Sequence, residues 1–393
     1  MGFDVSRVAE VDAWLLGAPH VGDGGQTFAD GLATRLRELG LPLWRVSFAL
    51  LTKHPEVRWR SVQWHESEGV KVLERQHQTA LEGYFTGSPV ALLIEGAAPI
   101  HVRLDGEDLR FPICRDLAEA GGTAYFAQGL PFANGEVSYI SWATRDPAGF
   151  LPEALDALTL LGLRLARRIE LESAYHATRS LLEVYLGKNA ARRVEGGQFR
   201  RGGGELIRAA IWFCDLRNFT AISDRTAPER VVELLDAYFD RVAGVIVLHG
   251  GEVLKFIGDA IMAIFPVGDD ARAACESALQ AAEDGLAALE QLNRERDAEP
   301  VLSIGIALHV GDVMYGNVGS RERLDFTVIS SAVNETSRLE GLCKSLKTPL
   351  LLSQAFVSAV DRQDVVDLAE QELKGVSTRL RVFTLARLRP AQS

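Results

Sequence analysis

Two aspartates stand where a carboxylate could take part in catalysis. Asp215 follows the apolar run IWFC, and Asp259 lies between the apolar runs of LKFIGDAIMAIF. A carboxylate at a strand end or in a turn between strands is accessible and rigidly held. Two such groups on neighbouring strands could share a pair of Mg²⁺ ions, because hard cations take oxygen ligands and leave room for phosphates. Taken singly, each aspartate could equally well serve only to form a turn.

A lysine precedes Asp259 by four residues in the same segment. Lys255 stands between Leu254 and Phe256 in an expected strand. An ammonium group inside an apolar strand needs a partner, which makes Lys255 a candidate binding residue. The alternative is a lysine at a strand edge, with its stem on apolar surface and its charge in water.

A third cluster lies in RLDFTVISSAVNETSRLE, residues 323–340. Asn334 and Arg338 are four residues apart at the start of an expected helix, so they share one of its faces. An amide and a guanidinium that point the same way suit a sugar and a phosphate. Thr327 lies on the strand before this helix. On spacing alone, a solvated helix face is the favoured interpretation of Asn334 and Arg338.

The elements expected around these residues alternate between strands and helices. We predict strands at 207–213, 252–257, 260–265, 301–310 and 325–329, and helices at 228–248, 271–292 and 332–346. The tight turn Gly258-Asp259 joins two of the strands. The order β-α-β-β-α-β, followed by further elements, predicts an α+β domain with a ferredoxin-like sheet and helices on one of its faces.

Four segments in this order resemble the catalytic domain of class III adenylate and guanylate cyclases. They are WFCDLRNFTAIS, GGEVLKFIGDAIMAIF, IGIALHVGDVMYGNVGS and DFTVISSAVNETSRLE. The resemblance covers about residues 203–388, and we assign the catalytic domain to 203–393. It implies that Asp215 and Asp259 bind two Mg²⁺ ions per site, or Mn²⁺ in their place. It also implies that Lys255 and Thr327 contact the adenine of ATP.

The resemblance gives roles to further residues. Asn334 and Arg338 match the pair that orients the ribose and stabilises the transition state. Lys374 resembles a lysine that contacts phosphate in some members. The backbone amides of residues 216–220, which include Phe219 and Thr220, could also hold phosphates. The sequence departs from many relatives at Ser330-Ser331, where they have Gly-Asp before the helix.

The expected base contacts favour ATP over GTP. Lysine can donate to adenine N1, and the threonine oxygen can accept from adenine N6. Guanine presents N1–H and O6, which a carboxylate at position 255 would suit better. We therefore predict an adenylate cyclase; the alternatives are a guanylate cyclase and a catalytically silent sensory module. In the family, the aspartates and the other site residues come from different chains, so the resemblance implies a homodimer with sites at its interface.

The sequence pattern of the N-terminal half predicts a separate α+β domain at about residues 1–155. We expect helices at 8–16 and 27–39, and strands at 43–51, 57–64, 91–94, 100–104, 123–128 and 137–142. This order resembles a GAF-type sensor domain, with PAS as the alternative. Its signal, a small molecule or a protein, and the direction of its effect are not indicated by the sequence.

A helical pattern then runs over about residues 151–194, within a connector that we place at 156–202. Leu158, Leu161, Leu165 and Ile169 recur at helical spacing. A pattern of this length between two domains suggests a dimeric signalling helix; the alternative is a helix packed on its own domain. The glycine-rich segment VEGGQFRRGGGE, residues 194–205, predicts a hinge.

Composition limits the class of protein. The 393 residues carry a formal net charge of −11, which argues against non-specific binding to nucleic acid or anionic membranes. The four cysteines form no CxxC pair, and no run approaches the roughly 18 apolar residues that span a bilayer. The first residues lack the apolar stretch of a signal peptide. We therefore expect a soluble cytoplasmic protein.

Overall fold

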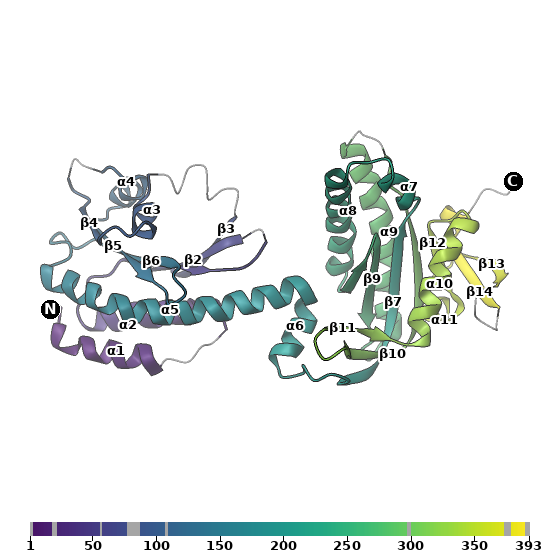
Figure 1. Cartoon of the computed structure of the whole chain (residues 1–393), viewed down its shortest axis with the longest axis horizontal. Coiled ribbons are helices and arrows are strands. Elements are labelled where there is room, and N and C mark those ends of the chain that lie inside the picture. The colour runs from purple at the N-terminus through teal and green to yellow at the C-terminus, as the bar shows by residue number, and fades with distance from the viewer. Residues whose placement is uncertain are drawn as a thin grey trace. The chain divides into compact units, whose positions relative to one another are not determined.

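The computed structural model describes residues 3–17, 22–55, 57–76, 87–106, 109–296, 300–372 and 379–389. It divides into two compact units, Met1–Val184 and Tyr185–Ser393 (Figure 1). Each unit contains helices and a sheet, so the predicted α+β class is confirmed. No helix within the described ranges is long and apolar enough to cross a membrane.

The first unit is built on an antiparallel sheet with the strand order β3-β2-β1-β6-β5-β4. Its strands are β1 Arg45–Leu51, β2 Val57–His65, β3 Gly69–Gln76, β4 Ile100–Arg103, β5 Ala124–Pro131 and β6 Val137–Thr144. The central strand β1 is buried along nearly its whole length, as expected for the apolar run that predicts it. The sequence did not predict β3, in which charged residues interrupt the apolar pattern.

Short helices surround this sheet: η1 Val5–Arg7, α1 Val8–Gly17, α2 Gln26–Glu38, α3 Pro89–Ile94 and α4 Pro112–Glu119. The prediction of a strand at 91–94 is wrong, because this segment belongs to α3. Ser88 caps the helix by accepting a hydrogen bond from the Ala91 amide at 3.3 Å, and Pro89 occupies the first turn. A serine cap followed by proline is a helix start signal that outweighs the apolar run after it.

The long helix α5, Pro152–Leu186, packs on the first unit along its N-terminal part. Four residues of the predicted helical pattern, Leu158, Leu161, Leu165 and Ile169, are at most 1% exposed in the core of this unit. This row therefore packs on its own domain, as the alternative interpretation expects, whereas the dimeric signalling helix stays a prediction. On the outer side of α5, Leu160 is 71% exposed and Leu163 is 65% exposed.

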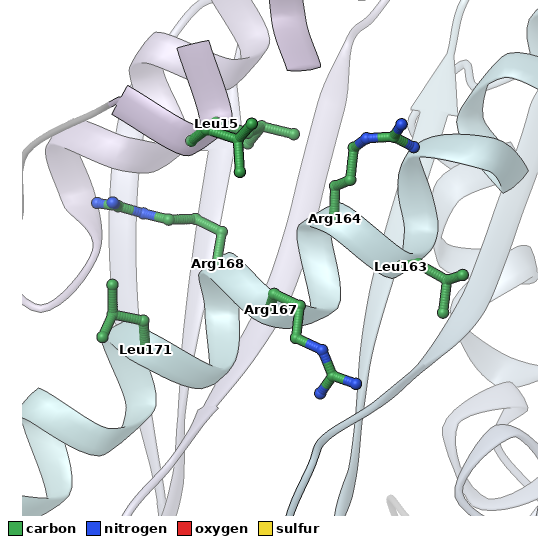
Figure 2. A pocket seen from close by; sticks show the side chains of 7 residues that line it. Leu15, Leu163, Arg164, Arg167, Arg168 and Leu171 are labelled. Carbon is green, nitrogen blue, oxygen red and sulfur yellow. The ribbon is translucent and has the colours of Figure 1, made fainter. Parts of the chain in front are cut away.

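A surface pocket lies between α1 and α5 (Figure 2). Its lining includes Leu15, Leu163, Leu171 and three arginines, Arg164, Arg167 and Arg168. Each arginine has a carboxylate partner: Arg164 pairs with Asp12 at 2.8 Å, Arg167 with Glu170 at 2.9 Å, and Arg168 with the buried Glu172. The pocket is therefore electrostatically satisfied and does not present an anion site.

The predicted helical pattern is interrupted at Gly187. This residue has a φ of 83°, which ends α5 and allows a new direction for α6, Lys188–Glu195. Ala190 and Ala191 of α6 are buried. Ala190 packs against sheet residues of the second unit, among them Ile211 and Tyr315. Helix α6 therefore belongs to the second unit, although the sequence suggested a connector there.

The second unit contains a sheet with the order β13-β14-β12-β10-β7-β9-β8, and β11 pairs with β10. Its strands are β7 Gly204–Leu216, β8 Glu252–Ile257, β9 Ala260–Pro266, β10 Ile304–Gly319, β11 Leu324–Ile329, β12 Leu350–Ser353, β13 Val365–Gln371 and β14 Leu380–Leu385. All pairs are antiparallel except β10 with β12. The central pair, β7 and β10, places the predicted motifs on neighbouring strands.

Helices cover both faces of this sheet: α7 Phe219–Ser223, α8 Pro228–Leu248, α9 Ala271–Arg296, α10 Ser331–Ser345, α11 Gln354–Val357 and η2 Ala386–Leu388. Ile306 and Leu308 of β10 pack with α8 and α9, whereas Ala307 between them packs with α10. The predicted order β-α-β-β-α-β is present from β7 to β10. The sequence predicted helices on one face of the sheet only. This holds for α8 and α9, whereas α10 and α6 lie on the other face.

Candidate active site

Asp215 and Asp259 lie close together at one end of the central strands. The register pairs Cys214 of β7 with Ile261 of β9, so Asp215 stands just beyond this pairing, near the turn that contains Asp259. Gly258, with a φ of 64°, makes this tight turn possible. Burial, then a hydrogen bond and charge repulsion from Asp259, raise the pKa of Asp215 to about 7.

This pair of carboxylates fits a divalent cation whose other ligands come from a substrate. Among the residues that the structure describes, no group of three or more His, Cys, Asp or Glu side chains could hold a metal alone. Mg²⁺ commonly binds through one or two carboxylates together with phosphate oxygens and water. The repulsion that raises the pKa of Asp215 would be relieved by a cation between the two side chains.

An ion pair joins the segment after Asp215 to α10. Arg217 Nη2 lies 2.9 Å from Glu340 Oε1, and both side chains are largely buried. Burial raises the pKa of Glu340, and the Arg217 guanidinium opposes that rise. The guanidinium crosses Gly305, where a Cβ atom would lie 1.3 Å from Arg217 Nη2. A side chain at position 305 would displace this guanidinium, and the ion pair ties α10 to the aspartate site.

Lys255 is bound to a carboxylate on another strand. Its Nζ donates a hydrogen bond to Asp325 Oδ2 of β11 at 2.7 Å. The pairing of β8 with β9 is irregular between Val253 and Lys255. Such a bulge changes the direction of a side chain, and bulges are frequent beside functional sites.

Thr327 lies on the same strand as Asp325, two residues further along. Its side chain is only 7% exposed, yet Oγ1 has no hydrogen-bonding partner among the described residues. A buried hydroxyl without a partner is unfavourable unless a ligand or water satisfies it. The Thr327 hydroxyl therefore remains available to a ligand or a water molecule.

Asn334 and Arg338 lie on the exposed side of α10, as their spacing predicts. The helix begins at Ser331, and Ser330 caps it by accepting a hydrogen bond from the Val333 amide at 3.2 Å. Ser330-Ser331, which replaces the Gly-Asp of many relatives, is therefore compatible with a well-formed helix start.

The remaining candidates are placed less directly. Phe219 packs against the core beside α8, and Thr220 is exposed at the start of α7. Lys374 lies outside the described residues. Sequence reasoning missed Asp325, Arg217 and Glu340, because each is recognised only by its contact with a residue on a distant element.

The C-terminal half matches a known family. Residues 205–386 correspond to the family described as the adenylate and guanylate cyclase catalytic domain. These residues therefore form an adenylate/guanylate cyclase catalytic domain, and the resemblance seen in this part of the sequence is confirmed.

Two curated relatives are adenylate cyclases. Adenylate cyclase 1 of Rhizobium meliloti (strain 1021) is 35% identical over 208 residues, which are 51% of this chain and 31% of that protein. The adenylate cyclase of Anabaena cylindrica is 38% identical over 162 residues, which are 40% of this chain and 31% of that protein. The chain thus spans about a third of the length of these relatives.

The solved structure of a bacterial light-regulated adenylyl cyclase has a similar fold. It aligns with a TM-score of 0.52 and 21% identity, over 67% of this chain and 84% of that structure. At this identity the likeness concerns the fold alone.

Proposed function

We propose that the chain is an adenylate cyclase that converts ATP to 3′,5′-cyclic AMP and pyrophosphate. The observation that carries this proposal is the buried, unsatisfied hydroxyl of Thr327 on the strand that also contacts Lys255. An ammonium donor and a hydroxyl acceptor complement adenine N1 and N6, respectively. Guanine would place its N1–H against the ammonium group.

The reaction requires the ribose 3′-oxygen to attack the α-phosphate in line and to displace pyrophosphate, with release of the 3′-hydroxyl proton. Asp215 and Asp259 would hold two Mg²⁺ ions, or Mn²⁺ ions in their place. When bound, these ions would lower the pKa of the 3′-hydroxyl and neutralise charge on the phosphates. Phe219 and Thr220 would contribute backbone amides to the phosphates, and Lys374 a side-chain ammonium.

Two residues of α10 would act on the reacting groups. Asn334 would orient the ribose, and Arg338 would meet the negative charge that develops on the α-phosphate. The Arg217–Glu340 ion pair restrains this helix relative to the aspartates of the same chain. In the proposed homodimer, each site takes the aspartates from one protomer and Lys255, Thr327, Asn334 and Arg338 from its partner.

An exposed apolar row supports the proposed homodimer. Met314 of β10 pairs with Leu206 of β7 on one side and with Ile329 of β11 on the other. All three side chains are exposed, Leu206 to 70%. A contiguous apolar row across three strands is favourably covered by a second protein surface.

We also propose that the N-terminal region, assigned to residues 1–155, is a GAF-like sensor that controls the cyclase through the connector at 156–202. The antiparallel sheet flanked by helices supports a sensor of this general type. If two connectors pair, the outer row of α5 that includes Leu160 and Leu163 is available for it. The four cysteines are buried free thiols, which supports a cytoplasmic location.

Turnover of purified chain tests the proposed function. The protein is incubated with ATP or GTP in the presence of Mg²⁺ or Mn²⁺, and cyclic nucleotide is quantified by chromatography. We expect cyclic AMP from ATP, and loss of this product in Asp259→Ala. Cyclic GMP from GTP with no product from ATP would identify a guanylate cyclase instead. No product under any condition would favour the catalytically silent module.

A further inference from the structure

The flexible side chain of Lys255 does not by itself fix the position of its ammonium group. Its side chain has four rotatable carbon–carbon bonds, and it is 31% exposed on β8, the strand at one end of the sheet order. A strongly hydrated ammonium group at such a position is free to turn toward water. A base-reading lysine therefore needs a second group that keeps its nitrogen in place.

Asp325 supplies such a group from the neighbouring hairpin. It lies on β11 opposite Val318 of β10, and its Oδ2 accepts the hydrogen bond from Lys255 Nζ at 2.7 Å. This hydrogen bond is the main cause that lowers the pKa of the Asp325 carboxyl group. The carboxylate is therefore charged at neutral pH. Arg323 contributes a smaller effect in the same direction.

The backbone brings three groups to one place. Asp325 and Thr327 are two residues apart on β11, so their side chains leave the same face of the strand. The pairing of β8 is irregular between Val253 and Lys255, and the lysine reaches Asp325 from there. The bound pair of ammonium group and carboxylate thus involves the same face of β11 as the unsatisfied hydroxyl.

We propose that Asp325 is a positioning residue that holds the Lys255 ammonium group at the base edge and thereby sets the preference for adenine over guanine. This inference rests on the proposed function. One N–H of the ammonium group is bound by Asp325, and the others remain for the adenine N1 acceptor. Guanine N1–H would face a fixed donor, and two donors that face each other leave both unsatisfied.

The preference for adenine over guanine follows from the restraint that Asp325 places on Lys255, rather than from the charge of Lys255 alone. Without Asp325, the ammonium group can move into water when guanine is present and escape the unfavourable contact. Adenine would lose its preformed donor, because part of the binding free energy would then be needed to order the lysine side chain. Removal of Asp325 should therefore weaken adenine binding and reduce discrimination against guanine.

Binding of unreactive nucleotides tests this inference separately from catalysis. Full-length chain is titrated calorimetrically with 3′-deoxy-ATP and 3′-deoxy-GTP in Mg²⁺, since neither analogue has the attacking hydroxyl group. For Asp325→Ala we expect about tenfold weaker binding of 3′-deoxy-ATP, the scale of one hydrogen bond to a charged group. Binding of 3′-deoxy-GTP should change much less, so the ratio of the two Kd values falls. With ATP as substrate, KM should rise more than kcat falls.

Two controls separate positioning from a general structural effect. Asp367→Ala removes another strand carboxylate that pairs with an arginine, at the opposite end of the sheet order, and should leave both Kd values unchanged. In a Lys255→Ala background, Asp325→Ala should cause no further loss of 3′-deoxy-ATP binding, because its effect acts through the lysine. Asp325→Glu should restore part of the discrimination.

The outcomes distinguish this inference from the proposed function. Unchanged or tighter 3′-deoxy-ATP binding by Asp325→Ala would overturn the positioning role, as would an equal loss in the Lys255→Ala background. Wild-type protein that discriminates between the analogues but yields no cyclic nucleotide would contradict the proposed catalysis and leave the positioning role supported. Wild-type protein that binds neither analogue would overturn both.

Discussion

Single side chains of α10 differ sharply in what their loss should do. Arg338 and Lys344 are both exposed cations on this helix, but only Arg338 matches a residue expected at the reacting phosphate. We predict that Arg338→Ala lowers kcat by about 100-fold or more, on the scale of removing one preorganised donor to developing charge. Lys344→Ala is the matched control and should retain wild-type kcat. Steady-state assays of cyclic AMP formation measure both values.

A buried histidine on the same side of the sheet predicts a dependence of stability on pH. His309 Nδ1 lies 2.9 Å from Ser353 Oγ and 3.5 Å from Glu335 Oε1. Burial, with a smaller effect from Arg208, lowers the pKa of His309 to about 4. Between this value and its ordinary pKa of about 6.5, the unfolded chain binds the proton more readily than the folded chain.

The contribution of His309 to folding is therefore complete above about pH 6.5 and is lost as the pH falls toward 4. The full loss is on the order of 3 kcal/mol. Burial raises the pKa of the neighbouring Glu335, which acts in the opposite direction. We predict that His309→Gln reduces the acid sensitivity of the free energy of unfolding, measured by urea titration from pH 4 to 7.5. A variant as acid-sensitive as wild type would contradict this assignment.

For single residues, the sequence indicated those with motif-like spacing but not the side chains that they contact. Asp215, Asp259 and Lys255 could be found because each interrupts an apolar run. Asp325 is a charged residue at a strand start, with nothing local to distinguish it from a solvated side chain. Its importance comes from a contact with β8, 70 residues away in the chain, and such a contact leaves no periodic signal.

Among the elements, α6 is held on the catalytic unit by a buried polar group. Glu252 of β8 is 6% exposed and accepts hydrogen bonds from Asn189 Nδ2 at 3.0 Å and from Tyr315 Oη at 2.6 Å. The guanidinium of Arg193 lies over the Tyr315 ring at 4.8 Å and pairs with Glu205 at 2.5 Å. Removing α6 would leave Glu252 with one fewer partner and expose the surface that Ala190 covers.

We predict that a chain beginning at residue 203 is less stable than one beginning at 186. The loss of a hydrogen bond to a buried charged group and of apolar burial should lower Tm by about 5 °C or more. Differential scanning calorimetry of the two chains measures this difference. Asn189→Ala in the longer chain should reproduce part of this decrease in Tm. Equal Tm values for the two chains would contradict the prediction.

Element boundaries were predictable where local signals were strong. Helix α8 spans Pro228–Leu248 as expected, because Pro228 suits its first turn and Gly250-Gly251 follows its end. The strands β12, β13 and β14 were not individually predicted, since β12 has only four residues and β13 and β14 mix polar with apolar residues. They are defined mainly by pairing with one another and with β10.

For the whole molecule, the proposed division of each site between two protomers gives a complementation test. Asp259→Ala and Arg338→Ala should each be inactive alone. Mixed and allowed to exchange subunits, they should regain activity, because each heterodimer contains one site with both residues intact. Random pairing predicts about a quarter of wild-type activity.

Cyclic AMP formation by the separate and mixed variants measures this recovery. Sedimentation checks that subunits associate, and the double variant Asp259→Ala with Arg338→Ala, mixed with wild type, provides the control for subunit exchange. Absence of recovery in mixtures shown to contain heterodimers would mean that each site is built within one chain.

Gly187 limits what kind of motion can pass along the connector. A continuous helix transmits axial twist, because rotation at one end turns the other by the same angle. Gly187, at a φ of 83° between α5 and α6, breaks that continuity. Under the proposed control of the cyclase by the first unit, a twist of α5 would therefore not pass unchanged into α6.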